Sequence, residues 1–171
     1  MPGDLPELPK FGAKASSAPA LSGLAAHEEA VIDAALAILG ARLRQAGGAF
    51  DSPAKVKQFL VLHMAARERE AFGVMFLDAQ SRLIEFEVMF EGTLTQTSVY
   101  PRELVRRALQ LNAASVILSH NHPSGETEPS QADEVLTATV KSALALVDVR
   151  TLDHLIVGGL GSMSFAERGL M

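Results

Sequence analysis

The stretch from residue 115 to residue 133, SVILSHNHPSGETEPSQAD, constrains the fold more than any other part of the chain. Its first five residues are a short apolar run, which is typical of a buried β-strand. Pro and Gly residues then indicate a loop, and the apolar periodicity of residues 131–147 predicts a long helix. We therefore expect a strand–loop–helix unit, with His120 and His122 at the point where the strand ends.

The remaining residues predict further helices and strands on both sides of this unit. We expect a flexible Pro/Ala/Ser-rich leader over 1–24. Three further helices are predicted, over about 26–45, from Pro53 onward with Ser52 as N-cap, and over 102–113. Strands are predicted over 71–78, 82–92, 154–158 and around 163–165. The first two strands form a hairpin through residues 79–81. This order of elements, α-α-β-β-α-β-α-β-β, is typical of an α/β fold with a mixed central sheet flanked by helices.

The periodicity of the apolar residues also predicts which face of each element is buried. The expected inner faces are Val31, Ile32, Ala35, Leu36 and Leu39 in the first helix, Val56, Phe59, Leu60 and Met64 in the second, Ile84, Phe86, Val88 and Phe90 in the second strand, and Leu104, Val105, Ala108 and Leu109 in the third helix.

The composition excludes several classes of protein. The 171 residues suit one domain, and a net charge of −5 gives no basic footprint for a phosphate backbone, so we do not expect nucleic-acid binding by this chain alone. No apolar run reaches the length of a membrane helix, and the N-terminus lacks the pattern of a signal peptide. We expect a soluble, cytoplasmic protein. Because the chain has no cysteine, any metal must be held by His, Asp or Glu.

The two histidines have the spacing of a metal site. Residues i and i+2 of an extended segment point to the same side, so His120 and His122 can approach one point in space. Asp133, in the first turn of the predicted helix, can supply an oxygen ligand, which leaves a fourth position for water. The same residues have another interpretation, in which Ser130 is the N-cap of the helix and Asp133 completes a capping box. Spacing alone leaves both interpretations open.

Residues 120–133, HNHPSGETEPSQAD, resemble the JAMM metalloprotease signature of MPN-domain proteins, H-x-H-x7-S-x2-D. Together with the preceding residues 91–119 and with LDHLIVG and SFAERGL further on, they are similar to the RadC-like branch of that family, over roughly residues 50–171. The resemblance implies an MPN (cytidine-deaminase-like) α/β fold over 49–171, preceded by a separate helix over 25–48. It also implies one zinc ion per chain, held by His120, His122 and Asp133.

The family pattern includes two further residues with catalytic roles. A glutamate ahead of the first core strand matches Glu70, two residues before Phe72, and would act as the general base for a zinc-bound water. Competing candidates for the general base are Glu68, Glu85, Glu87 and Glu91. In this family the residue matched by Ser130 donates its hydroxyl to the developing oxyanion.

Other conspicuous residues are given lesser roles. His154 lies outside the metal motif, and we expect a structural histidine at the start of a strand. We assign no role to His27 and His63, which lie on predicted helices. The arginines at 102, 106 and 107 are expected on a solvated face that could contact an acidic partner.

These observations lead to three hypotheses about function. The first is a zinc-dependent hydrolase of amide bonds that acts on a peptide or a protein conjugate. The second is a DNA-repair or mobile-element accessory protein. Longer RadC-like proteins carry a helix-hairpin-helix region, whereas here only the leader and two helices precede the MPN core, which disfavours this role. The third is a non-catalytic MPN scaffold, although all four motif positions are filled.

Overall fold

The computed structural model describes residues 18–45, 52–92 and 98–171. Its elements are α1 (Ala18–Leu43), α2 (Pro53–Met64), β1 (Ala71–Leu77), β2 (Leu83–Glu91), α3 (Pro101–Gln110), β3 (Ser115–Asn121), α4 (Gln131–Ala145), β4 (Arg150–Gly158) and β5 (Gly161–Ser164). The predicted order of elements is therefore confirmed. None of the helices in these ranges is long and apolar enough to cross a membrane.

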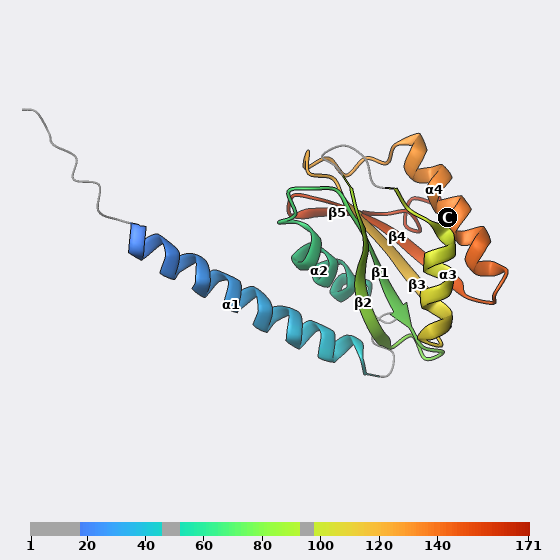
Figure 1. Cartoon of the computed structure of the whole chain (residues 1–171), viewed down its shortest axis with the longest axis horizontal. Coiled ribbons are helices and arrows are strands. Elements are labelled where there is room, and N and C mark those ends of the chain that lie inside the picture. The colour runs from blue at the N-terminus through green and yellow to red at the C-terminus, as the bar shows by residue number, and fades with distance from the viewer. Residues whose placement is uncertain (1–17, 46–51, 93–97) are drawn as a thin grey trace, which may run out of the picture.

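The five strands form one mixed sheet in the order β2-β1-β3-β4-β5. Only β3 and β4 are parallel, and α4 is the crossover that a parallel pair requires. The helix α2 covers one face of the sheet, while α3 and α4 cover the other (Figure 1). The predicted mixed sheet flanked by helices is confirmed.

The two central strands are buried on both faces, and their alternation fixes the side on which the motif lies. In β1, Met75 and Leu77 pack toward α2, whereas Phe72, Val74 and Phe76 pack toward α3 and α4. In β3, Val116 and Leu118 pack toward α4. Because side chains alternate along a strand, His120 follows them onto the α4 face. The apolar core thus determines where the first histidine of the motif points.

The second strand departs from the predicted alternation because it contains two β-bulges. The pairing of β1 with β2 shifts at two places, which leaves Ile84 and Met89 as the extra residues. As a result Phe86 and Val88 pack toward α2, whereas Ile84 and Phe90 pack toward α3. The prediction that these four apolar residues share one face was wrong.

The predicted inner face of α2 is confirmed, since Val56, Phe59, Leu60 and Met64 are buried. Two other helical faces differ from the prediction. In α3, Leu104 and Ala108 are buried, but Leu109 is 53% exposed. Five helical residues after Leu104, Leu109 is rotated well away from the buried stripe, so its predicted inward position was wrong.

The first helix is longer and more exposed than predicted. It begins at Ala18, so residues 18–24 are helical rather than part of a leader, and the rest of the predicted leader lies outside the described residues. The end of the helix packs on α2, with Leu43 fully buried and Leu36 and Leu39 partly buried. Val31 and Ile32 are 55% and 39% exposed, because α1 runs out beyond the edge of the domain (Figure 1). Their predicted burial was wrong.

Candidate metal centre

The two histidines of the motif lie at the carboxyl end of β3. His120 is inside the strand and only 2% exposed, and His122 follows directly after the strand ends. Their Nε2 atoms are 2.9 Å apart. The strand continues two residues beyond the predicted end, because Asn121 still pairs with Val157 of β4. This continuation keeps the backbone extended through the motif and turns both rings toward the same point.

Asp133 reaches that point from the first turn of α4. Its Oδ1 lies 3.3 Å from His120 Nε2, and its Oδ2 lies 3.7 Å from His122 Nε2. The carboxylate also completes a capping box, because Oδ2 accepts hydrogen bonds from the backbone N–H and the hydroxyl of Ser130, at 2.8 Å and 2.6 Å. The two interpretations of Asp133 are therefore compatible, since the helix cap holds the carboxylate beside the histidines.

The donor atoms of these three side chains fit the dimensions of a metal site. One ligand atom from each of His120, His122 and Asp133 lies within 4.8 Å of the others. With metal–nitrogen bonds of about 2.0–2.1 Å, as for zinc, neighbouring donors of a tetrahedral site are about 3.3 Å apart. From His120 Nε2, the distances to His122 Nε2 and to Asp133 Oδ1 are 2.9 and 3.3 Å, close to that value. The other carboxylate oxygen, Oδ2, lies 3.7 Å from His122 Nε2. The group could hold one metal ion.

A chain of hydrogen bonds behind His120 orients its free nitrogen toward this point. The hydroxyl of Thr137 donates to the Asp133 carbonyl at 2.6 Å, so its oxygen accepts from Nδ1–H of His154, also at 2.6 Å. His154 Nε2 must then accept from Nδ1–H of His120, at 2.9 Å. This leaves the Nε2 lone pair of His120 directed at the metal position. Partners of this kind fix the tautomer of a ligand histidine.

The second histidine is oriented in the same way by the loop that follows it. His122 Nδ1–H donates to the Glu126 carbonyl at 3.0 Å, which again leaves Nε2 unprotonated. Gly158 at the end of β4 supports this loop, because a Cβ there would overlap the Gly125 carbonyl and lie 2.7 Å from the Glu126 oxygen. Two imidazole lone pairs and a carboxylate converge without a proton between them, which is an arrangement that a cation stabilises.

The surroundings of Asp133 and His154 shift the pKa values of both groups downward. Burial opposes ionisation of Asp133, but the neighbouring His120 ring and the hydrogen bonds from Ser130 outweigh it and hold the pKa of this carboxyl well below its usual range. Burial, followed by the repulsion of His120, lowers the pKa of His154 well below its ordinary value. Asp133 is therefore an anion and His154 a neutral ring near neutral pH.

His154 and Thr137 are the residues of the centre that the sequence did not reveal. His154 is fully buried in the middle of β4, outside the group of ligands but in direct contact with His120. Thr137 lies one helical turn after Asp133 on α4, and this spacing from a predicted ligand is the only signal in the sequence. The interpretation of His154 as a structural histidine missed its contact with a ligand.

The predicted general base directly precedes β1. The register of β1 with β3 places Phe72 opposite His120, and Glu70 lies two residues before Phe72, just outside the strand. The ring of Phe72 lies over that of His120, with centroids 6.5 Å apart, so this face of β1 is turned to the centre. Glu70 is partly buried and is not one of the three grouped ligands. Its catalytic role stays a prediction.

Two of the glutamates that compete with Glu70 as general base are bound to an arginine of α3 instead. Glu85 and Glu87 of β2 both form ion pairs with Arg107 of α3. Arg102 and Arg106 pair with Glu103 on the same helix. The three arginines of α3 therefore have carboxylate partners within this chain.

A further competitor, Glu91, forms an ion pair with Arg67 at 2.9 Å. No interaction assigns Glu68 to the centre. His63 packs against the aromatic rings of Phe59 and Phe86 on the α2 side of the sheet, away from the metal group.

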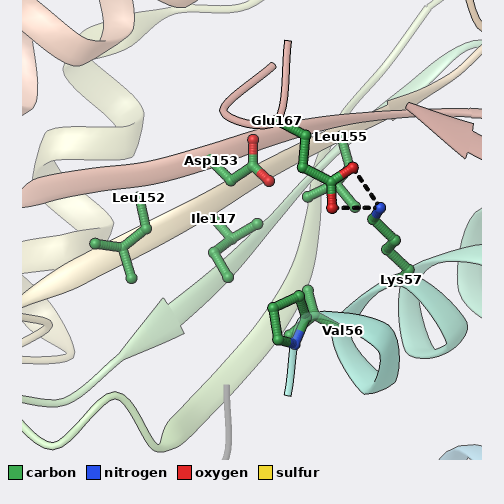
Figure 2. A pocket seen from close by; sticks show the side chains of 8 residues that line it. Val56, Lys57, Ile117, Leu152, Asp153, Leu155 and Glu167 are labelled. Carbon is green, nitrogen blue, oxygen red and sulfur yellow. Dashed lines mark hydrogen bonds and ion pairs between the residues drawn. The ribbon is translucent and has the colours of Figure 1, made fainter. Parts of the chain in front are cut away.

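A pocket on the opposite face of the sheet is separate from this centre. Figure 2 shows its apolar wall, which includes Ile117 and Leu155, and the ion pair between Lys57 and Glu167 at 2.7 Å. Ile117 belongs to the core on the α2 side, whereas His120 lies on the α4 side. The pocket contains none of the grouped ligands, so the chemistry of the metal centre is not performed there.

Comparison with known proteins identifies the family. The chain is 58% identical to a UPF0758 protein of Methylibium petroleiphilum over 142 residues, which are 83% of this chain and 64% of that relative. It is 54% identical to the UPF0758 protein YkfG of Escherichia coli over 145 residues, 85% of this chain and 92% of YkfG. The chain thus spans about three-fifths of several relatives that it matches. Residues 50–170 match the model of the RadC-like JAB domain, and this chain therefore belongs to that family.

Proposed function

We propose that this chain is a zinc-dependent hydrolase of amide bonds, of the metallopeptidase or isopeptidase type. The observation that carries the proposal is the convergence of His120, His122 and Asp133, with both imidazole Nε2 lone pairs directed at one point. Two histidines and one carboxylate form a ligand set that leaves a coordination position open, as in catalytic rather than structural zinc sites. Zinc in such a site lowers the pKa of a bound water and polarises a carbonyl group.

The residues around the centre supply the remaining functions of a hydrolase. Glu70, directly before β1, would accept a proton from the attacking water and deliver it to the leaving amine. Ser130 would donate its hydroxyl to the oxyanion, for which its Oγ–H must leave the Asp133 carboxylate that it contacts at 2.6 Å. Membership of the RadC-like JAB family supports this assignment of roles.

Elemental analysis combined with a cleavage assay tests the proposal. The purified protein should contain one zinc per chain, and His122→Ala should lose it, because one of three protein ligands is missing. Glu70→Gln should keep zinc and thermal stability but lose about 10²–10⁴-fold in turnover of a fluorogenic peptide library, since the amide cannot accept the proton. Glu68→Gln provides the matched control, with the same change two residues away.

Four results would contradict parts of the proposal. A protein that binds no zinc when purified or reconstituted would refute the metal site. Loss of zinc in Glu70→Gln would make Glu70 a ligand, and unchanged turnover in that variant would remove it as the general base. A zinc-loaded protein that cleaves neither peptides nor isopeptide-linked conjugates would refute the hydrolase function.

A further inference from the structure

Asn121 lies between the two ligand histidines but faces the other side of β3. It is only 2% exposed, so its amide must find hydrogen-bond partners inside the protein. It finds them on the connection between α2 and β1 and on the first residue of β1. The Oδ1 atom accepts from the Ala71 N–H at 2.9 Å, and the Nδ2 atom donates to the carbonyls of Arg67 and Arg69, at 3.3 Å and 3.1 Å.

These hydrogen bonds flank Glu70 in the chain. The amide of Asn121 binds the carbonyl of Arg69, directly before Glu70, and the N–H of Ala71, directly after it. The Glu70 carbonyl itself accepts from the Gly92 N–H at 2.8 Å. Residues 65–70 belong to no helix or strand, so regular secondary structure does not fix them. The backbone that carries Glu70 is therefore held mainly by side-chain and loop contacts.

We propose that Asn121 is a positioning residue that fixes Glu70 relative to the metal ligands. Asparagine is the shortest side chain that offers one acceptor and two donor hydrogens at once, as this connection requires. Because Asn121 shares its strand with His120 and is followed by His122, it ties the general base to the same rigid element as the ligands. This inference rests on the proposed function, in which Glu70 is the base.

The expected effect is on turnover rather than on metal binding. Misplacing a catalytic group by about 1 Å can cost about 10²-fold in rate. Asn121→Ala should therefore lower kcat by about 10–100-fold, with little change in KM. Zinc content should stay at the level of the unmodified protein, since both histidines and Asp133 remain. The Ala71 amide should lose its protection from hydrogen exchange, which NMR detects without any substrate.

Ser119→Ala is the matched control, because Ser119 is also buried in β3 and its hydroxyl donates to the Gly73 carbonyl of β1 at 3.2 Å. It removes a hydrogen bond between the same two strands but leaves the Glu70 connection intact, so kcat should be unchanged. If Asn121→Ala does not fold, Asn121→Asp keeps the size of the side chain and the acceptor for Ala71 but loses both donors. It should show the same loss of kcat.

A double variant separates positioning from a general structural effect. In the Glu70→Gln background, Asn121→Ala should lower kcat no further, because the group that it positions is already inactive. Loss of zinc in Asn121→Ala, additive losses in the double variant, or unchanged kcat would each overturn the inference. If the unmodified protein cleaves no peptide, the proposed hydrolase fails, and the Ala71 amide still decides whether Asn121 holds the connection. Retained protection in Asn121→Ala would show that it does not.

Discussion

Replacing Thr137 by valine tests the hydrogen-bond chain behind the metal centre with a minimal change in shape. Valine keeps the branched side chain but has no hydroxyl. The Nδ1–H of His154 then loses its acceptor in a fully buried environment, and the link from the Asp133 carbonyl to His154 is broken. His154 is no longer fixed in the tautomer that receives Nδ1–H of His120.

Two magnitudes follow from this loss. An unsatisfied buried donor costs about 1–3 kcal/mol, so the free energy of unfolding of the metal-free protein should fall by about that amount. Loss of a group that orients a ligand histidine typically lowers metal affinity about 10–100-fold. At about 1.4 kcal/mol per factor of ten, this corresponds to about 1.4–2.8 kcal/mol of binding free energy. Both effects should appear although no ligand has been changed.

Urea unfolding of the metal-free protein and competition with a chelator for zinc measure the two effects separately. Thr139→Val is the matched control, because Thr139 also lies on α4 and its hydroxyl donates to the carbonyl four residues earlier, at 2.8 Å, but it faces solvent. Its stability and zinc affinity should stay close to those of the unmodified protein. If Thr137→Val binds zinc as tightly as Thr139→Val does, the orienting role of His154 and Thr137 is refuted.

Two further predictions concern the loop after His122 and the pH dependence of stability. Gly158→Ala should weaken zinc binding in the same chelator assay, because the new Cβ would displace the loop whose Glu126 carbonyl orients the candidate ligand His122. Gly161→Ala should not, because the heavy atom nearest to its new Cβ lies at an ordinary contact distance of 3.4 Å. Burial, with a smaller contribution from Arg67, lowers the pKa of His63 in the folded protein. The contribution of neutral His63 to the free energy of unfolding is therefore complete above the pKa of about 6.5 that histidine has in the unfolded chain. It is lost as the pH falls below that value, because the unfolded chain then binds the proton more readily. His63→Phe should therefore reduce the loss of unfolding free energy between about pH 7 and about pH 5, and an unchanged slope would contradict this assignment.

Local patterns in the sequence were sufficient for the order of the elements, and together with the family resemblance they indicated the candidate ligands. The short apolar run before His120, the turn residues after it and the cap at Ser130 are signals that act over a few residues, and the structure confirms each of them. The i, i+2 spacing of the histidines and the helix cap at Asp133 determine directions relative to one strand and one helix. For this reason, once the resemblance to the JAMM signature had indicated His120, His122 and Asp133, their convergence could be expected before the packing of the sheet was known.

Only the tertiary structure decided the features that depend on neighbours distant in sequence. The bulges at Ile84 and Met89 arise from pairing with β1, and the exposure of Val31 depends on where the domain ends beneath α1. His154 meets His120 only because α4 carries the chain across to a parallel strand beside β3. Periodicity reports which face of an element is apolar, but it carries no information about which element covers that face. The sequence by itself therefore indicated the candidate ligands, whereas the orientation of their side chains was decided by packing between strands and a helix that are far apart in the chain.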